Sequence, residues 1–213
     1  MKITAIKSLA IPAIKVVRFA RFTDFRGYFT EPFRKSDFST QLEFMKGVDF
    51  FQFNESFSRS NVVRGLHFQW NPFMGKLVRT VQGRMVDLFL DIRKGSPTYG
   101  KAAAYDIPSS SDKDYAEWIW IPPGFAHGNY FTQESTIEYV CSGEYSPGCE
   151  AGISPLSADI DWSLCDPVLK AEFDAIVANT PIITDKDKNG LSLTAWTADR
   201  RSNEFLYSAL GDK

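Results

Sequence analysis

The chain has 213 residues, of which 44% are hydrophobic and 23% are charged, and its formal net charge is −2. These values are typical of a single globular domain, and they exclude a strongly basic surface for nucleic acid. The sequence shows no apolar run long enough to span a bilayer and no signal-peptide pattern. We therefore expect a cytoplasmic protein with neither a membrane nor a nucleic-acid partner. Three cysteines without CxxC spacing argue against a disulfide framework or a zinc site.

The first predicted helix lies in the N-terminal third, at residues 36–46. Ser36 is its expected N-cap, and Phe38, Leu42 and Met45 fall on one face. Elsewhere the aromatic fraction of 15% favours β structure and aromatic-lined clefts.

Short alternating strands separated by turns dominate up to about residue 162. Residues 76–81 and 84–91 alternate between apolar and polar side chains, and the Gln-Gly pair between them predicts a β-hairpin. Further strands are predicted at residues 117–121 and 138–142. Many short strands of this kind predict a mainly β fold, a double-sheet jelly roll whose mouth holds a ligand.

The C-terminal part of the chain predicts helices again. Asp166 as N-cap and Pro167 at the first helical position match a helix start, and apolar residues recur at helical spacing over residues 168–177. Residues 199–210 predict one further helix. We expect a single domain over residues 1–213, with a helical C-terminal segment from about residue 166.

The chain contains two histidines, and both lie in strand-rich segments flanked by glycine. Histidine has an unperturbed pKa near neutrality, so it is the readiest general base or metal ligand. On the predicted strand at residues 62–69, alternate positions share one face, so Arg64 joins His67 in a pocket only if the strand bends at Gly65. From spacing alone, a hydrogen-bonded core histidine and a chemically active one are equally open.

A metal site is the sharper alternative for His67. Small β-barrels of this sort hold a metal through an His-x-His pair, a carboxylate and a distant histidine, but Gln69 stands where the second histidine would be. We therefore expect no metal. His127 lies in a Pro-Pro-Gly-Phe-Ala-His-Gly string, which is compatible with a turn or with a donor to an anionic or sugar oxygen. Spacing alone does not choose between these two interpretations.

Other charged and phenolic side chains have equally plain interpretations. A phosphate-type ligand would need side-chain cations, because the sequence has no Walker loop and no GxGxxG motif after a strand. Most Arg and Lys residues are solvated, the charge run at residues 185–188 is typical of a solvated loop, and Tyr139 is typical of a half-buried strand. The candidate cations are Arg26, Arg64, Lys76, Arg79, Arg93 and Lys186.

A series of motifs runs in one order from about residue 4 to residue 191. They are DFRGYFTE at residues 24–31, QFNES at 52–56, VRGLHFQ at 63–69, GKLVR at 75–79, DIRKGSPTYG at 91–100, GFAHG at 124–128, Tyr139, YSPGCE at 145–150 and DKDK at 185–188. In these segments the chain resembles the nucleotide-sugar epimerases of the dTDP-4-dehydrorhamnose 3,5-epimerase family. The resemblance implies a cupin-type double-stranded β-helix (jelly roll) with a few peripheral helices. It also implies a homodimer and a reaction that uses no metal or redox cofactor.

The resemblance further implies a role for each matching residue. His67 is similar to the general base that removes a proton beside a ketone, and Asp187 to the carboxylate that orients this base. Tyr139 resembles the acid that returns a proton from the opposite face. Lys76 and Arg64 resemble the cations placed near the developing enolate and the diphosphate. The other matches are positions that bind the nucleotide sugar: Arg26, Glu31, Gln52, Asn54, His127, Glu150 and Lys186.

The implied enzyme is an isomerase that epimerises C3, C5 or both in a nucleotide-diphosphate 4-keto-6-deoxyhexose, in deoxysugar biosynthesis for lipopolysaccharide or antibiotics. Three alternatives stay open: a single-centre 3- or 5-epimerase on a dTDP-, CDP- or GDP-sugar, a metal-dependent cupin enzyme, and a sugar-binding cupin without activity. The missing His-x-His pair argues against the second. His67, Tyr139 and Asp187 together argue against the third, because binding alone needs no acid and base on opposite faces.

The chain also departs from the family's pattern beside the implied site. Phe53 stands where an acidic or small residue is usual, Val140 replaces a lysine, and Asn129 replaces an aromatic residue after the GFAHG string. The segment at residues 163–179 is longer than expected, and the C-terminal extension has no matching part. These departures leave the substrate and the number of inverted centres open.

Overall fold

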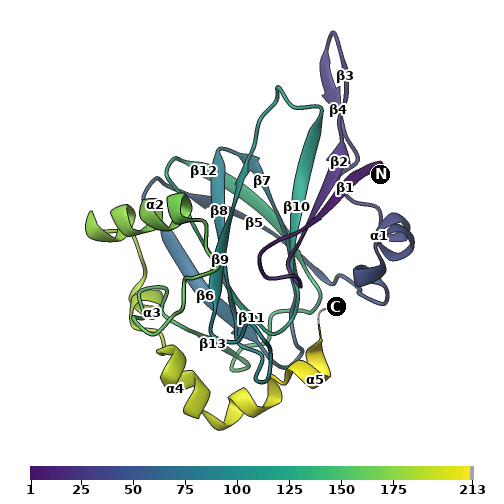
Figure 1. Cartoon of the computed structure of the whole chain (residues 1–213). Coiled ribbons are helices and arrows are strands. Elements are labelled where there is room, and N and C mark those ends of the chain that lie inside the picture. The colour runs from purple at the N-terminus through teal and green to yellow at the C-terminus, as the bar shows by residue number, and fades with distance from the viewer. Residues whose placement is uncertain (212–213) are drawn as a thin grey trace.

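Two antiparallel β-sheets face each other in the computed structural model, which describes residues 1–211 (Figure 1). The larger sheet has the strand order β1-β2-β10-β7-β12-β5, and the smaller has the order β13-β6-β11-β8-β9. The expected mainly β jelly roll is confirmed. The strands are β1 (Ile3–Ser8), β2 (Lys15–Ala20), β3 (Phe22–Asp24), β4 (Gly27–Phe29), β5 (Gln52–Ser58), β6 (Val63–Gln69), β7 (Lys76–Gln82), β8 (Arg84–Asp91), β9 (Ala102–Pro108), β10 (Tyr115–Ile121), β11 (Phe125–Tyr130), β12 (Ser135–Cys141) and β13 (Glu150–Gly152).

Strand alternation divides the side chains between an inner layer and two outer faces. In β11, Phe125 belongs to an apolar cluster with Val78 of β7, across the space between the sheets. Ala126 and Tyr130 belong to a different cluster, on the outer face of the five-stranded sheet. His127 has the same parity as Phe125, so it faces inward between the sheets.

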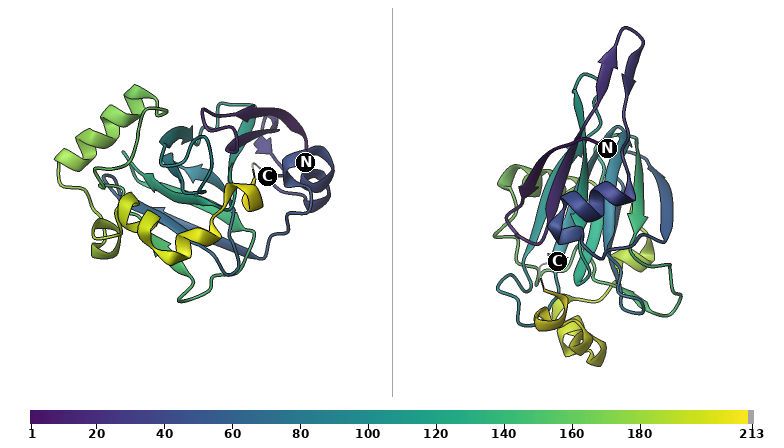
Figure 2. Two further views of the ribbon diagram at one scale, coloured as in Figure 1. Left: turned by 60° about the horizontal axis from the view of Figure 1, so that its bottom comes forward. Right: turned by 90° about the vertical axis from the view of Figure 1, so that its right-hand side faces the viewer.

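Helices cover the outer face of each sheet (Figure 2). On the six-stranded sheet, α1 (Lys35–Gln41) and the 3₁₀ turn η1 (Glu43–Met45) pack apolar side chains against Trp118 and Trp120 of β10. On the five-stranded sheet, Trp196 and Phe205 pack on Phe68 of β6, with ring centroids 4.5 and 5.4 Å away. The C-terminal helices are α2 (Pro167–Ala178), α3 (Asp185–Lys188), α4 (Leu193–Ala198), η2 (Arg200–Glu204) and α5 (Tyr207–Leu210).

The predicted hairpin of residues 76–91 is wrong, although both of its strands exist. β7 pairs with β10 and β12 in one sheet, whereas β8 pairs with β9 and β11 in the other. Gly83, at φ +82°, turns the chain from one sheet to the other. A Cβ atom there would lie 2.4 Å from the Glu134 carbonyl, so the turn is too closely packed for any other residue. The Gln-Gly pair therefore marks a crossing between the two sheets.

The helix predicted at residues 36–46 is shorter and starts earlier. α1 begins after Arg34, which makes no side-chain cap, so Ser36 lies inside the helix and is not its N-cap. The remaining turn forms η1. Phe38, Leu42 and Met45 are nevertheless all buried, as their spacing predicts.

Of the two helices predicted in the C-terminal part, one is confirmed and one is wrong in extent. α2 matches its prediction, and the Asp166 side chain accepts a hydrogen bond from the Val168 backbone N–H at 2.8 Å. The single helix expected over residues 199–210 is in fact the two short helices η2 and α5. The run at residues 185–188 is the helix α3, and one of its carboxylates, Asp187, is buried.

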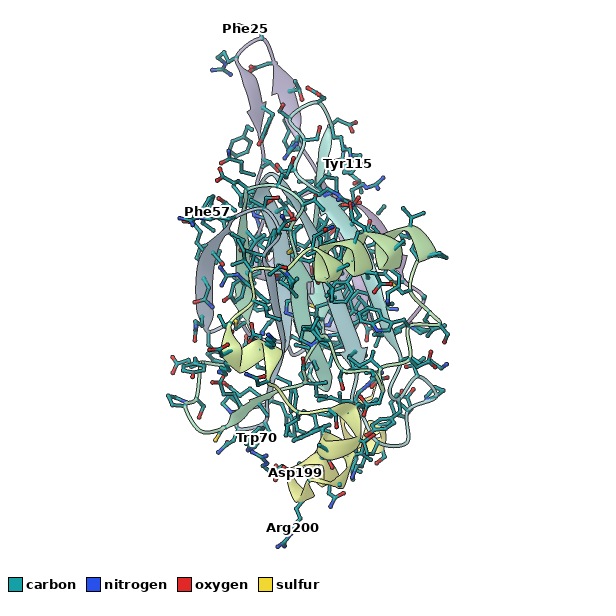
Figure 3. The ribbon with its side chains drawn as sticks, turned by 90° about the vertical axis from the view of Figure 1, so that its left-hand side faces the viewer. Phe25, Phe57, Trp70, Tyr115, Asp199 and Arg200 are labelled. Atoms are coloured by element: carbon teal, nitrogen blue, oxygen red, sulfur yellow. The ribbon has the colours of Figure 1, made fainter. Side chains whose placement is uncertain are left out.

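The β3–β4 hairpin projects from the body of the molecule (Figures 1 and 3). Phe25 at its tip is 97% exposed, and Phe22, Tyr28 and Phe29 beside it are exposed as well. A second exposed group lies on the edge strand β5, where Phe53 and Phe57 face outward. The three cysteines are unpaired, as expected. Over the described residues 1–211, none of the helices has the length and apolar character needed to cross a bilayer.

Candidate active site

Two neighbouring cavities open between the sheets. The larger has a volume of about 490 Å³ and the smaller about 290 Å³. Both are lined by His67, Lys76 and Tyr139, so these three side chains lie where the cavities meet. Of the twelve residues predicted from the sequence, seven line the larger cavity and three more line the smaller one. Those ten are Gln52, Asn54, Arg64, His67, Lys76, His127, Tyr139, Glu150, Lys186 and Asp187.

His67 forms a hydrogen-bonded pair with Asp187, 120 residues later in the chain. Its Nε2 lies 2.6 Å from Asp187 Oδ1, and the second carboxylate oxygen accepts the Gly65 backbone N–H at 3.1 Å. Burial acts to raise the pKa of Asp187, but the contacts from His67 and Gly65 together hold it below its ordinary value. Asp187 is therefore an anion at neutral pH, and because a carboxylate only accepts hydrogen bonds, it accepts a hydrogen bond from the proton carried by His67 Nε2.

A short helix places the Asp187 carboxylate against β6. Thr184 caps α3, because its hydroxyl accepts the Asp187 backbone N–H at 3.2 Å. The Asp187 side chain is 5% exposed, while that of His67 is 34% exposed. The pair thus has one buried member and one that reaches the cavity.

A bend in β6 brings Arg64 to the same cavity as His67, as predicted. His127 pairs with His67 and Asn129 with Arg64, so β6 holds one extra residue between these two rungs. Gly65 sits in that bulge at φ +102°, and a Cβ atom there would lie 2.6 Å from the Gly128 backbone. The Arg64 guanidinium is anchored by donating to the Ser58 hydroxyl and to the Phe57 carbonyl, both at 3.0 Å.

Lys76 and Tyr139 face the cavities from the opposite sheet. They belong to the adjacent strands β7 and β12, and Tyr139 pairs with Asn54 on the next strand. Burial raises the pKa of the Tyr139 phenol, so at neutral pH it carries its proton. Burial lowers the pKa of Lys76, against which the charges of Cys141, Asp87 and Glu150 act.

A second histidine–carboxylate pair lies on the five-stranded sheet. His127 Nε2 is 2.7 Å from Asp87 Oδ1, and both side chains are buried, at 7% and 0% exposure. Burial raises the pKa of Asp87, although the charge of His127 opposes this shift. His127 therefore lies on strand β11 with its ring fixed, and the alternative of a histidine in a turn is wrong.

Polar side chains around the smaller cavity form a connected group. Lys186 donates to Glu150 at 2.7 Å, and the Tyr145 hydroxyl donates to the same carboxylate at 2.9 Å. Burial acts to raise the pKa of Glu150, but these donors hold it below its ordinary value. Gln52 donates to Asn54 at 3.0 Å and accepts the Tyr145 backbone N–H at 2.7 Å. Amides, a carboxylate and an ammonium thus converge there.

A model of the family described as dTDP-4-dehydrorhamnose 3,5-epimerase matches residues 8–195. The chain belongs to this family. The resemblance read from the motifs is confirmed, and so is the expectation of an isomerase of the epimerase class.

Relatives from several bacteria agree with this assignment. The dTDP-4-dehydrorhamnose 3,5-epimerase of Sinorhizobium fredii is 36% identical over 190 residues, covering 88% of this chain and 88% of the relative. The crystal structure of the Legionella pneumophila enzyme RmlC, in complex with dTDP-4-keto-L-rhamnose, superposes with a TM-score of 0.75 at 29% identity, covering 93% and 96% of the two chains. NovW, a 4-keto-6-deoxy sugar epimerase of Streptomyces spheroides, gives a TM-score of 0.77 at 25% identity, covering 99% and 96%.

Two residues expected from the family resemblance lie away from both cavities. Arg26, on the projecting hairpin, is 76% exposed and forms an ion pair with Asp24 at 2.6 Å. Glu31 contacts the N-terminal amine and Arg34. Two other candidate cations are used in structural pairs, Arg79 with Glu138 and Arg93 with Asp91.

Sequence reasoning missed three residues that shape the candidate site: Asp87, Thr184 and Tyr145. Asp87 is a charge inside the apolar strand β8, and that interruption was the signal that could have identified it. Thr184 precedes the DKDK run, where an N-cap pattern could have indicated a helix. Tyr145 begins the YSPGCE motif, which gave it no role of its own, and its contact with Glu150 places it beside the smaller cavity. Within residues 1–211, His, Cys, Asp and Glu side chains form no group of three that could hold a metal ion.

Proposed function

We propose that this chain epimerises C3, C5 or both in the hexose of a nucleotide-diphosphate 4-keto-6-deoxy sugar. The observation that carries the proposal is the placement of His67, held by Asp187, on one sheet and of Tyr139 and Lys76 on the other, around shared cavities. Inversion at carbon needs a base and an acid on opposite faces of the ring, and facing sheets supply that arrangement. The dTDP-sugar bound to the Legionella relative supports the substrate class.

In this mechanism His67 is the base. Its Nδ1 takes the proton from the carbon beside the ketone, the C–H electrons form a C=C bond, and the carbonyl π electrons move to the oxygen. The imidazolium that forms is stabilised by the Asp187 anion, 2.6 Å from Nε2. Thr184 and the Gly65 N–H fix this carboxylate, so the ring stays in one orientation and one tautomer.

Lys76 and Tyr139 complete the reaction from the other sheet. Lys76 donates to the enolate oxygen, where a preorganised donor stabilises the developing charge. Tyr139 then gives its phenolic proton to the carbon from the face opposite His67, and the ketone re-forms. Solvent afterwards reprotonates the phenolate and takes the proton from the imidazolium.

The remaining lining residues bind the rest of the substrate. Arg64 and His127 line the larger cavity, where they bind the anionic diphosphate and sugar oxygens. Gln52, Asn54 and Glu150 line the smaller cavity with Lys186 beside them, and their amides and charges match the polar groups of a nucleotide. The whole substrate thus spans both cavities across His67.

Incubation with dTDP-4-keto-6-deoxyglucose in D₂O tests this function. We expect deuterium beside the ketone, seen by proton NMR and by a mass increase of about one unit for a single-centre enzyme or about two for a 3,5-epimerase. dTDP-glucose is the control substrate, because it has no ketone and its ring C–H bonds are not acidic. Absence of label in the keto sugar, with bound substrate demonstrated by calorimetry, would leave a binding protein without activity. Loss of labelling on treatment with a chelator, together with stoichiometric metal by elemental analysis, would favour a metal-dependent cupin.

We also propose that the active form is a homodimer in which the β3–β4 hairpin of one copy reaches the site of the other. The hairpin, the edge strand β5 and the residue before β5 expose seven large aromatic side chains, which is more apolar surface than a monomer usually leaves in water. Figure 3 places Phe25 at the hairpin tip and Phe57 on β5. Arg26 and Glu31 lie on or beside this hairpin, so a second copy is the route by which they reach a substrate. The seven are Phe22, Phe25, Tyr28, Phe29, Phe51, Phe53 and Phe57.

Mixing two inactive variants tests this arrangement. Arg26→Ala removes a cation that, in this proposal, enters the active site of the other subunit. His67→Asn removes the base from the active site of the same subunit. A mixed dimer has one site with both native residues, so mixing equal amounts should restore about a quarter of the wild-type activity. If both residues serve the same copy, mixing restores nothing, and light scattering shows whether a dimer forms at all.

The extent of the domain and the cellular compartment are also part of this proposal. We infer that residues 1–213 act as one epimerase domain, because the helical segment from about residue 166 packs Phe173, Trp196 and Phe205 on the five-stranded sheet. Three unpaired cysteines fit a reducing cytoplasm, where nucleotide sugars for lipopolysaccharide or antibiotic deoxysugars are made.

A further inference from the structure

Asn129 has an unusual position in the larger cavity. It lies on β11 two residues after His127, so both side chains point inward from the same strand. Its residue exposure is only 5%, and it contributes to the lining of the cavity. Its Oδ1 atom is buried and has no hydrogen-bond partner among the described residues 1–211.

The two charged side chains opposite Asn129 on the neighbouring strands already contact other groups of the chain. Arg64, its partner across the β6–β11 rungs, donates to Ser58 and to the Phe57 carbonyl. Asp87, its partner on β8, contacts His127 through Oδ1, and its Oδ2 has no hydrogen-bond partner within residues 1–211. Much of the remaining wall is aliphatic, from Val62, Val63, Ile137, Ile182 and Ile183. The Asn129 amide is thus a buried hydrogen-bonding group on the cavity wall, and its oxygen has no partner among residues 1–211.

We propose that Asn129 is a specificity-determining residue whose amide binds a hydroxyl group of the hexose ring. This inference rests on the proposed function, since it assumes a keto sugar in the larger cavity. A hydroxyl can donate to the amide oxygen and accept from the amide nitrogen, whereas a hydrogen or a methyl can do neither. A ring without that hydroxyl leaves the amide unpaired, which is costly for a buried polar group. The aliphatic wall accepts the deoxygenated C6 methyl by the same logic.

The test measures the rate of each of three proteins with each of three sugars. The sugars are dTDP-4-keto-6-deoxyglucose and its 2-deoxy and 3-deoxy analogues. The proteins are the wild type and Asn129→Leu, which is close in size but has no polar atoms. The matched control is Asn179→Leu, the same change at an exposed residue at the end of α2. The rate measured is deuterium incorporation beside the ketone in D₂O, expressed as kcat/KM, with circular dichroism as a check on folding.

We expect the wild type to prefer the parent sugar to one of the two analogues by about 100-fold, because a site built to bind a hydroxyl rejects a ring that lacks it. Asn129→Leu should lose most of this preference by reacting more slowly with the parent sugar alone, and Asn179→Leu should keep it. Equal wild-type rates for all three sugars would overturn the proposal. So would an Asn129→Leu variant that is slower by one common factor on every sugar. If instead the wild type labels none of them, the epimerase function itself has failed.

Discussion

The two histidine–aspartate pairs of this chain use the same hydrogen bond in opposite surroundings. His67 and Asp187 join β6 to α3, and the imidazole is 34% exposed toward the cavities. His127 and Asp87 join two strands of one sheet, and both side chains are buried. The distances differ by only 0.1 Å, at 2.6 and 2.7 Å. The two pairs therefore differ in the exposure of the imidazole, 34% for His67 and 7% for His127, and we propose that this difference separates the proton-transfer pair from the binding group.

The two carboxylates also differ in the direction in which their pKa values are shifted. Both are buried, but Asp187 receives the Gly65 backbone N–H in addition to His67, and its pKa falls below the ordinary value. The second oxygen of Asp87 has no partner within residues 1–211, and burial raises the pKa of that side chain. More complete burial raises the pKa of Asp87, whereas the contacts of Asp187 with His67 and the Gly65 N–H outweigh the effect of its burial.

The largest expected effect is on Asp187→Asn. Without the carboxylate the imidazole loses its fixed tautomer and the partner for its positive charge, so kcat should fall by about 10³-fold or more. Steady-state kinetics measures this. Asp185→Asn, an exposed change on the same helix, is the control and should retain wild-type rates. A similar loss in both variants would mean that α3 is merely sensitive to charge.

Tyr139→Phe separates the two halves of the reaction. Removing the phenolic proton should slow formation of the inverted sugar by about 10²-fold. Exchange of the substrate proton with solvent through His67 should continue, because the base and Lys76 are untouched. NMR in D₂O follows both rates in one sample. Equal loss of exchange and inversion would contradict the assignment of Tyr139 as the acid.

Substitutions of Asp87 should affect mainly the free energy of unfolding. Asp87→Ala leaves the buried His127 without its partner, which should lower the free energy of unfolding by about 1–3 kcal/mol. Asp87→Asn keeps an acceptor oxygen and removes a buried charge, so its cost should be under about 1 kcal/mol. Urea unfolding at pH 7 measures both, with the exposed Asp112→Asn as reference. An equal loss of unfolding free energy in the Ala and Asn variants would show that the Asp87–His127 hydrogen bond does not contribute to stability.

The smallest effect is a difference in pH dependence between the two pairs. The lowered pKa of Asp187 gives stability that is present above pH 3.8 and is lost as the pH falls through the folded-state pKa. The raised pKa of Asp87 gives stability that is present below pH 3.8 and is lost as the pH rises through its folded-state pKa. Relative to its own Asn variant, the wild type should therefore gain stability with pH at position 187 and lose it at position 87. Each tenfold difference in proton affinity between the folded and unfolded chain corresponds to about 1.4 kcal/mol, and urea unfolding in steps from pH 2 upward measures the change.

The strands and most of the cavity-lining residues could be predicted from the sequence. Features that depend on contacts between residues far apart in the chain could not. Alternation predicted β7 and β8, but nothing local shows that Gly83 sends them into different sheets. His67 and Arg64 were predicted to share a pocket only through a bend at Gly65, and the bulge is there. The pairing of Asp87 with His127, 40 residues apart, and the burial of Asp187 in a charged run depend on tertiary packing. No pattern of neighbouring residues contains that information.

The central claim is that His67, and not His127, takes the proton from the sugar. Deuterium incorporation from D₂O into dTDP-4-keto-6-deoxyglucose, compared at saturating substrate in His67→Asn and His127→Asn, tests it most directly. We predict no incorporation above the uncatalysed rate for His67→Asn. We predict incorporation within about tenfold of wild type for His127→Asn, with a raised KM. Wild-type incorporation in His67→Asn, or its loss in His127→Asn alone, would contradict the account.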